Sequence, residues 1–181
     1  MVVAVDPTSS PAELRAELAE DLVRGGYVFR ERDASGVQRF FDKYLVLSRP
    51  GLLTRAAPLL ADLLPTECER IAVTGVASAV LGGAVAQYTG VPLLIGLDTD
   101  SVDRFGGEIF PGMRAVLLED VVETGGRALE GADALAACGA EVLTVLCLLD
   151  RDGGASGRLA EASYGLRALF TETQLPGLET R

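Results

Sequence analysis

The second half of the chain alternates short apolar runs with segments of helical pattern. The apolar runs span residues 71–74, 91–97, 114–118 and 141–149, and each predicts a buried strand. Helices are predicted between them, over residues 79–88 and in the segment that Gly139 ends. Strands of almost continuous apolar character, separated by helices, are typical of a parallel sheet covered on both faces. We therefore predict an α/β fold with a mainly parallel sheet flanked by helices.

The first third of the chain opens with a helical pattern and continues with shorter elements. Ser10 is a favoured N-cap residue and Pro11 fits the first helical turn, so a helix is predicted from there to Gly25. Two short strands are predicted over residues 27–32 and 40–45, around a turn at 33–36, and a further helix from 49 onward. No linker or repeat interrupts the chain, which predicts one domain over residues 1–181.

The composition favours a soluble protein with a sizeable core. Hydrophobic residues make up 49% of the chain, enough for a core without disulfides or metal. Lysine and arginine number 16 against 26 aspartate and glutamate, a formal charge of −10, which argues against nucleic-acid binding because that needs a basic face. No apolar run is long enough for a membrane helix, and residues 1–11 are too short and polar for a signal peptide. We therefore expect a cytoplasmic protein.

The spacing of the cysteines and the lack of histidine exclude several kinds of active site. Cys68, Cys138 and Cys147 have no metal-ligand spacing, and the last two lie in apolar runs, so we interpret the three as buried, reduced thiols. The chain contains no histidine. This excludes any catalytic triad or metal site that depends on imidazole.

The segment after the third predicted strand carries the candidate chemistry. Two adjacent carboxylates, Glu119 and Asp120, precede two valines and then Thr124-Gly125-Gly126 at the start of a helix. In open α/β sheets, ligands bind beyond the carboxyl ends of the strands, where glycines let backbone N–H groups close on a phosphate. Adjacent carboxylates suit ribose hydroxyls or a hydrated Mg²⁺. The alternative is an ordinary strand-to-helix turn with solvated acids.

This segment resembles the phosphoribosyl diphosphate motif of type I phosphoribosyltransferases, in which two acids and two aliphatic residues precede Thr-Thr-Gly-Gly-Ser. The resemblance implies that Glu119 and Asp120 hold the ribose hydroxyls and that residues 124–126 cradle the 5′-phosphate. Glu123 and Arg127 depart from the motif. A carboxylate beside a phosphate is unfavourable unless it is paired or points away. Arg127 would either bind the phosphate or neutralise Glu123.

Two further segments are similar to the orotate branch of that family. Phe40-Phe41-Asp42-Lys43-Tyr44 resembles its aromatic-Asp-Lys-Tyr strand, and Lys43 is the only lysine of the chain. An ammonium beside aromatic rings suits a planar, anionic pyrimidine, whereas the alternative is an edge-strand lysine with its head in water. Arg151, in Leu149-Asp150-Arg151, resembles the arginine that contacts the orotate carboxylate. Alternatively it caps a sheet edge.

The resemblance also places two segments near the pyrophosphate. Residues 73–78 occupy the position of the pyrophosphate loop, where backbone amides at Gly75 and Val76 would bind the anion. Residues 96–109 occupy the position of a mobile catalytic loop, but contain no lysine or histidine and only one cation, Arg104. Because cations in that loop stabilise the departing pyrophosphate, we expect transfer to be slow or absent.

The resemblance implies a type I phosphoribosyltransferase fold, with a small N-terminal hood over about residues 10–48 and a core over about residues 50–175. It also implies phosphoribosyl transfer from phosphoribosyl diphosphate to orotate or a related pyrimidine, with Mg²⁺ and release of pyrophosphate, in a homodimer. The alternative is a catalytically impaired relative that binds a pyrimidine nucleotide for sensing or for a specialised pathway.

The candidate residues follow from these motifs. The candidate catalytic residues are Asp120, Glu119, Lys43 and Arg104. The candidate substrate-binding residues are Phe40, Phe41, Lys43, Gly75, Val76, Glu119, Asp120, Val121, Val122, Glu123, Thr124, Gly125, Gly126, Arg127 and Arg151. Apart from Asp120, no side chain is expected to ligate a metal directly.

Overall fold

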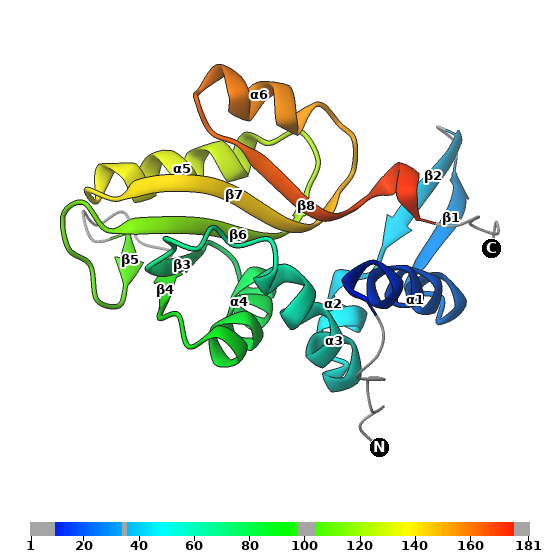
Figure 1. Ribbon diagram of the computed structural model, residues 1–181. Helices are drawn as coiled ribbons and strands as arrows, with labels where there is room; N and C mark the ends of the chain where they lie inside the picture. The colour runs from blue at the N-terminus through cyan, green and yellow to red at the C-terminus, as the bar shows by residue number, and fades with distance from the viewer. Residues whose placement is uncertain (1–9, 34–35, 98–103, 176–181) are drawn as a thin grey trace.

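The computed structural model describes residues 10–33, 36–97 and 104–175, with the backbone alone for most of 29–40. A six-stranded sheet in the order β5-β4-β3-β6-β7-β8 forms its centre (Figure 1). All neighbouring strands are parallel except the pair β4–β5. The strands are β3 (Arg70–Val73), β4 (Leu93–Gly96), β5 (Phe105–Gly106), β6 (Arg114–Val122), β7 (Glu141–Asp150) and β8 (Leu166–Thr171). The predicted α/β fold with a mainly parallel sheet is confirmed.

Helices cover both faces of this sheet (Figure 1). They are α3 (Pro50–Ala61) and α4 (Val76–Thr89) on one face, and α5 (Gly126–Ala137) and α6 (Ala155–Glu161) on the other. Side chains of a strand alternate between the two faces, so Val116 and Leu118 of β6 join the core with α3 and α4. Ala115 and Leu117 join the core with α5 and α6. This double burial explains the almost continuous apolar runs.

A smaller unit lies beyond the end of the sheet at which β6 and β7 finish (Figure 1). It consists of α1 (Pro11–Arg24), β1 (Val28–Asp33), β2 (Gly36–Phe41) and α2 (Lys43–Leu47), with β1 and β2 forming a separate antiparallel pair. Helix α1 begins as predicted, because Ser10 and Glu13 form a reciprocal capping box. The hood is thus placed over the carboxyl ends of the central strands.

The strand predicted over residues 40–45 is wrong. Strand β2 ends at Phe41, and Asp42 is the N-cap of α2, its Oδ1 accepting the N–H of Leu45 at 2.9 Å. An aspartate cap satisfies a free helical N–H group, which outweighs the strand propensity of the residues around it. Lys43 therefore lies in the first turn of a helix rather than on an edge strand.

Other boundaries differ from the predicted ones in ways that matter for the site. Strand β6 continues to Val122 instead of ending at Leu118, so Glu119 and Asp120 are strand residues, and Glu119 is paired with Cys147 of β7. Elements β5, α6 and β8 have no counterpart in the sequence prediction. Within the described ranges, no helix has the length and apolar character needed to cross a membrane.

Candidate functional site

A cavity of about 340 Å³ lies where the hood meets the ends of β6 and β7. Its walls are Phe41 and Lys43 from the hood, Glu119 and residues 121–128 from β6 and the turn after it, and Arg151 after β7. The hood, the acidic strand end and the glycine turn are far apart in sequence. The structure therefore brings most of the candidate binding residues together around one hollow.

The two adjacent carboxylates are buried and held by hydroxyl groups. Glu119 is 8% exposed and Asp120 4%. Thr74 donates a hydrogen bond to Glu119 Oε1 at 2.5 Å, and the Ser78 hydroxyl lies 2.8 Å from Glu119 Oε2 and 3.1 Å from Asp120 Oδ1. Since a hydroxyl has one proton, Ser78 donates to one of the two acids at a time. Both carboxylates are thereby fixed in orientation.

Thr74 and Ser78 are site residues that the sequence reasoning did not single out. Thr74 lies in the turn between β3 and α4, and Ser78 lies in the first turn of α4. Strand β3 is the neighbour of β6 in the sheet. The sequence signal for both is a hydroxyl residue within a few positions of the end of a buried strand. The carboxyl ends of parallel strands share one edge of the sheet, so such residues can reach ligand groups on the neighbouring strand.

Burial raises the pKa of Glu119 above its ordinary value, because the carboxylate loses solvation. The hydrogen bonds from Thr74 and Ser78 oppose this shift, the charge of Asp120 adds to it, and Arg127 opposes it. The site therefore holds an acid whose ionisation is disfavoured by its surroundings. Such groups are concentrated at functional sites.

Lys43 forms an ion pair with Asp120, its Nζ lying 2.7 Å from Oδ2. The Lys43 side chain is 25% exposed and the Asp120 side chain 6%. Among the described residues, no hydrogen bond reaches Asp120 Oδ2, so the ammonium supplies the compensation for this buried oxygen. The ammonium of Lys43 thus faces Asp120 of β6. Asp120 itself is not among the residues that line the cavity.

The turn after β6 has the geometry of an anion-binding site. Gly125 has φ +76°, which favours glycine, and a Cβ at this position would lie close to the Ala155 backbone, 3.1 Å from its Cα. No side chain caps the start of α5 among the described residues. The first N–H groups of this helix are therefore available beside the cavity, at the positive end of the helix dipole.

Glu123 pairs with Arg151, which follows the neighbouring strand β7 and also lines the cavity. Its Oε2 lies 3.6 Å from Arg151 Nη1, and Arg151 Nε lies 3.4 Å from Glu172 Oε2. Arg127 is exposed and also lines the cavity, but the ion pair of Glu123 is made with Arg151. Of the two roles left open for Arg127, neutralising Glu123 is therefore the less supported.

Arg104 lies in a different place from the other candidates. With side chains of α5 that include Glu130 and Asp133, it lines a second hollow of about 700 Å³. Its carbonyl oxygen accepts the N–H of Leu97 at 2.8 Å. The structure does not bring Arg104 into the cavity beside Glu119.

The remaining candidates are placed only in part. Gly75 is the N-cap of α4 and Val76 its first residue, at the start of the helix that also carries Ser78. The side chain of Phe40, and residues 98–103 of the expected catalytic loop, lie outside the described part of the chain. In the described part, no three His, Cys, Asp or Glu side chains gather as a metal site would require.

Comparison with known proteins identifies the family. The chain is 30% identical over 151 residues to the orotate phosphoribosyltransferase of Nocardioides sp. strain JS614, which covers 81% of this chain and 84% of the relative. The chain belongs to the orotate phosphoribosyltransferase family. The resemblance found in the motifs is therefore confirmed.

Solved structures agree with this assignment. The UMP synthase of Leishmania donovani matches with a TM-score of 0.80 and 27% identity, over 88% of this chain and 37% of that one. The orotate phosphoribosyltransferase of Mycobacterium tuberculosis, solved with 5-phospho-α-D-ribosyl 1-diphosphate, matches with a TM-score of 0.73 and 24% identity, over 90% of this chain and 98% of that one. No family model matches the chain. The type I phosphoribosyltransferase fold is thus confirmed.

Proposed function

We propose that this member of the orotate phosphoribosyltransferase family transfers the phosphoribosyl group of phosphoribosyl diphosphate to orotate or a related pyrimidine. A ring nitrogen of the base attacks C1′ and loses its proton. The C1′–O bond to pyrophosphate breaks, and pyrophosphate leaves with the bonding electron pair. The observation that carries the proposal is one cavity lined by the buried Glu119, the glycine turn after β6, Lys43 and Arg151, with Asp120 paired to Lys43.

Each part of the cavity has a role in this reaction. The 5′-phosphate would lie at the start of α5, where Gly125 and Gly126 leave backbone N–H groups accessible. Glu119, which lines the cavity, would bind the ribose hydroxyls. Glu119 and the charge of Asp120 beside it would stabilise the positive charge that develops on the ribosyl group as pyrophosphate leaves. Departing pyrophosphate would meet the N-terminus of α4 at Gly75.

The base would lie on the hood side of the cavity. Phe41 supplies an apolar wall, and Lys43 supplies an ammonium that Asp120 holds in position. Arg151 also lines the cavity, and its guanidinium suits a carboxylate or an imide edge. The name of the Nocardioides relative and the ligand of the M. tuberculosis structure support these substrates.

Mg²⁺ is part of the proposal as an ion that enters with phosphoribosyl diphosphate. The carboxylate oxygens of Asp120 already contact Ser78 and Lys43, and the described residues offer no cluster of three acidic, thiol or imidazole ligands. These residues fit an ion held mainly by substrate oxygens and water, which Mg²⁺ prefers to keep. When bound, the ion supplies positive charge to the pyrophosphate.

We also propose that the protein forms a homodimer, which sedimentation measurements would test.

Calorimetric titration with phosphoribosyl diphosphate and Mg²⁺ tests the site. Asp120→Asn removes a charge with almost no change in shape and should weaken binding, because Asp120 holds Lys43 in position at the cavity. Asp62→Asn, at the exposed C-terminus of α3, makes the same change away from the cavity and should leave affinity unchanged. Unchanged affinity in Asp120→Asn, with the fold intact by circular dichroism, would contradict the role assigned to this residue.

A further inference from the structure

The Arg151 guanidinium lies close to two carboxylates of the described residues. Glu123 Oε2 lies 3.6 Å from its Nη1, and Glu172 Oε2 lies 3.4 Å from its Nε. Two carboxylates therefore share one cation at the edge of the cavity. An anionic group of a ligand that approaches Arg151 from the cavity must therefore compete with carboxylates that are already paired with it.

The two carboxylates differ in how firmly they are held. The Glu172 side chain is 14% exposed and belongs to a short 3₁₀ helix, η1 (Glu172–Gln174). The Glu123 side chain is 60% exposed and lines the cavity, and its distance of 3.6 Å from Arg151 is too long for a good hydrogen bond. Glu123 is therefore the carboxylate that a ligand can displace.

The position of this ion pair affects the choice of acceptor base, if the proposed transfer reaction is correct. Arg151 lines the same cavity as Lys43, and its guanidinium suits a carboxylate on the base. We propose that Glu123 is a specificity-determining residue, which competes with the carboxylate of the acceptor for Arg151. The preference of the site for a carboxylated pyrimidine over an uncharged one is then smaller than it would be without the carboxylate of Glu123.

A different role for Glu123 is distinguishable from this one. Glu123 directly precedes Thr124 in the phosphate-binding turn, so its charge could instead act on the 5′-phosphate. A charge acting on the phosphate weakens binding of every nucleotide equally. A charge that competes for Arg151 weakens binding of carboxylated nucleotides only.

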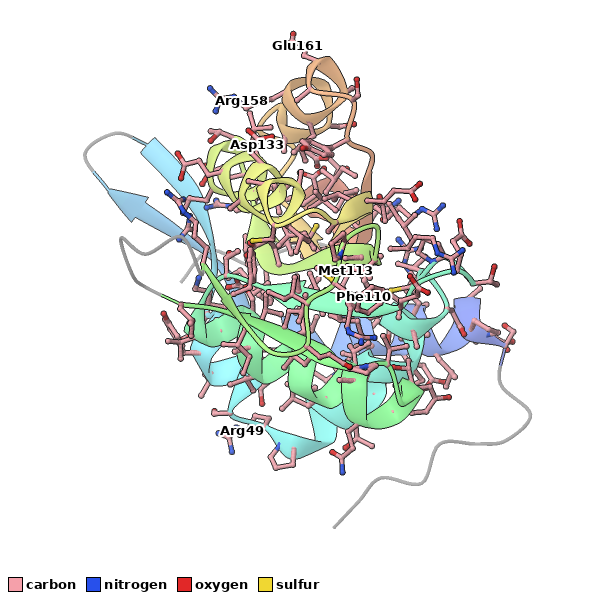
Figure 2. All side chains as sticks on the ribbon, turned by 90° about the vertical axis from the view of Figure 1, so that its left-hand side faces the viewer. Arg49, Phe110, Met113, Asp133, Arg158 and Glu161 are labelled. Atoms are coloured by element: carbon pink, nitrogen blue, oxygen red, sulfur yellow. The ribbon has the colours of Figure 1, made fainter. Side chains whose placement is uncertain are left out.

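Orotidine 5′-monophosphate and uridine 5′-monophosphate make the test sharp, because they differ by one carboxylate. Their Kd values are measured by calorimetry for the unaltered protein, for Glu123→Gln and for Glu161→Gln. Glu161 is an exposed acid at the outer end of α6 (Figure 2), so its substitution changes the net charge equally. Glu123→Gln should raise the preference for the orotidine nucleotide about fivefold, the upper range for an exposed ion pair. Glu161→Gln should leave the preference unchanged.

The remaining outcomes decide between the competing roles. An equal change in both Kd values for Glu123→Gln, or no change in their ratio, would overturn the proposal while leaving the transfer reaction intact. In an Arg151→Gln background the effect of Glu123→Gln on the ratio should disappear, because the shared cation is absent. If neither nucleotide binds the unaltered protein, the proposed function itself fails, and the inference fails with it.

Discussion

Replacing Lys43 with methionine removes the ammonium that lies 2.7 Å from Asp120 Oδ2 and keeps most of the apolar stem. The carboxylate then remains in a place where its side chain is 6% exposed, with no hydrogen bond to Oδ2 from the described residues. An uncompensated buried charge is strongly unfavourable. We therefore expect Lys43→Met to destabilise the folded protein as well as to weaken binding of the base.

The magnitude follows from the geometry of the pair. Two charges at this distance attract by about 6 kcal/mol at an effective dielectric constant of roughly 20, most of which is offset by desolvation. Removing one partner of a fully buried pair costs about 3–5 kcal/mol. Because the Lys43 side chain is 25% exposed, water reaches the pair and the expected loss is smaller, about 2–3 kcal/mol. For a chain of this size, that lowers Tm by about 4–12 °C.

Scanning calorimetry and urea unfolding measure this loss, with two further variants for comparison. Arg24→Met breaks ion pairs with Glu20 and Asp21 in which Arg24 is 72% exposed, and should cost less than about 1 kcal/mol. Adding Asp120→Asn to Lys43→Met removes the stranded charge and should restore much of the lost stability. A Tm for Lys43→Met equal to that of Arg24→Met would refute the reasoning.

Three further predictions concern the acid, the glycine turn and the buried thiol. Burial raises the pKa of Glu119, so ionisation of Glu119 lowers the stability of the folded protein as pH rises. Glu119→Gln should therefore raise Tm by about 2–4 °C at pH 7. The gain in Tm should be absent in scans below the ordinary pKa of glutamate, 4.5. Gly125→Ala places a Cβ at φ +76° and 3.1 Å from Ala155 Cα, and should cost about 1–2 kcal/mol in urea unfolding. Gly157→Ala, in α6, places a Cβ with nothing within 4 Å beyond its chain neighbours and its own helix backbone, and should instead stabilise by up to about 1 kcal/mol. Burial raises the pKa of the Cys147 thiol, so a thiol titration of the native protein should leave this cysteine unreacted until the chain unfolds.

The fold was predictable because its main signals are local. The apolar runs that become β3, β6 and β7 are buried on both faces by helices, and the adjacent residues Ser10 and Pro11 mark the start of α1. The strand predicted through Lys43 failed because its end depends on a backbone turn at Asp42. Whether an aspartate caps a helix or lies in a strand is decided by the packing of the hood, which the local sequence does not contain.

The site was predictable where it is contiguous and not where it depends on strand order. Residues 119–127 form a continuous motif, and the structure places most of them around one cavity. The hydroxyls of Thr74 and Ser78 reach Glu119 because β3 lies beside β6. Glu172 reaches Arg151 because β8 lies beside β7. These neighbours come from distant parts of the chain, so no spacing in the sequence reveals them.

A turnover assay tests the proposed function most directly. The purified protein is mixed with Mg²⁺, phosphoribosyl diphosphate and orotate, and the loss of orotate absorbance is followed beside the release of pyrophosphate. The account predicts turnover that requires all three components and is lost in Asp120→Asn. Binding of orotidine 5′-monophosphate without any release of pyrophosphate would contradict it, and would favour a relative that binds pyrimidine nucleotides without transferring the phosphoribosyl group.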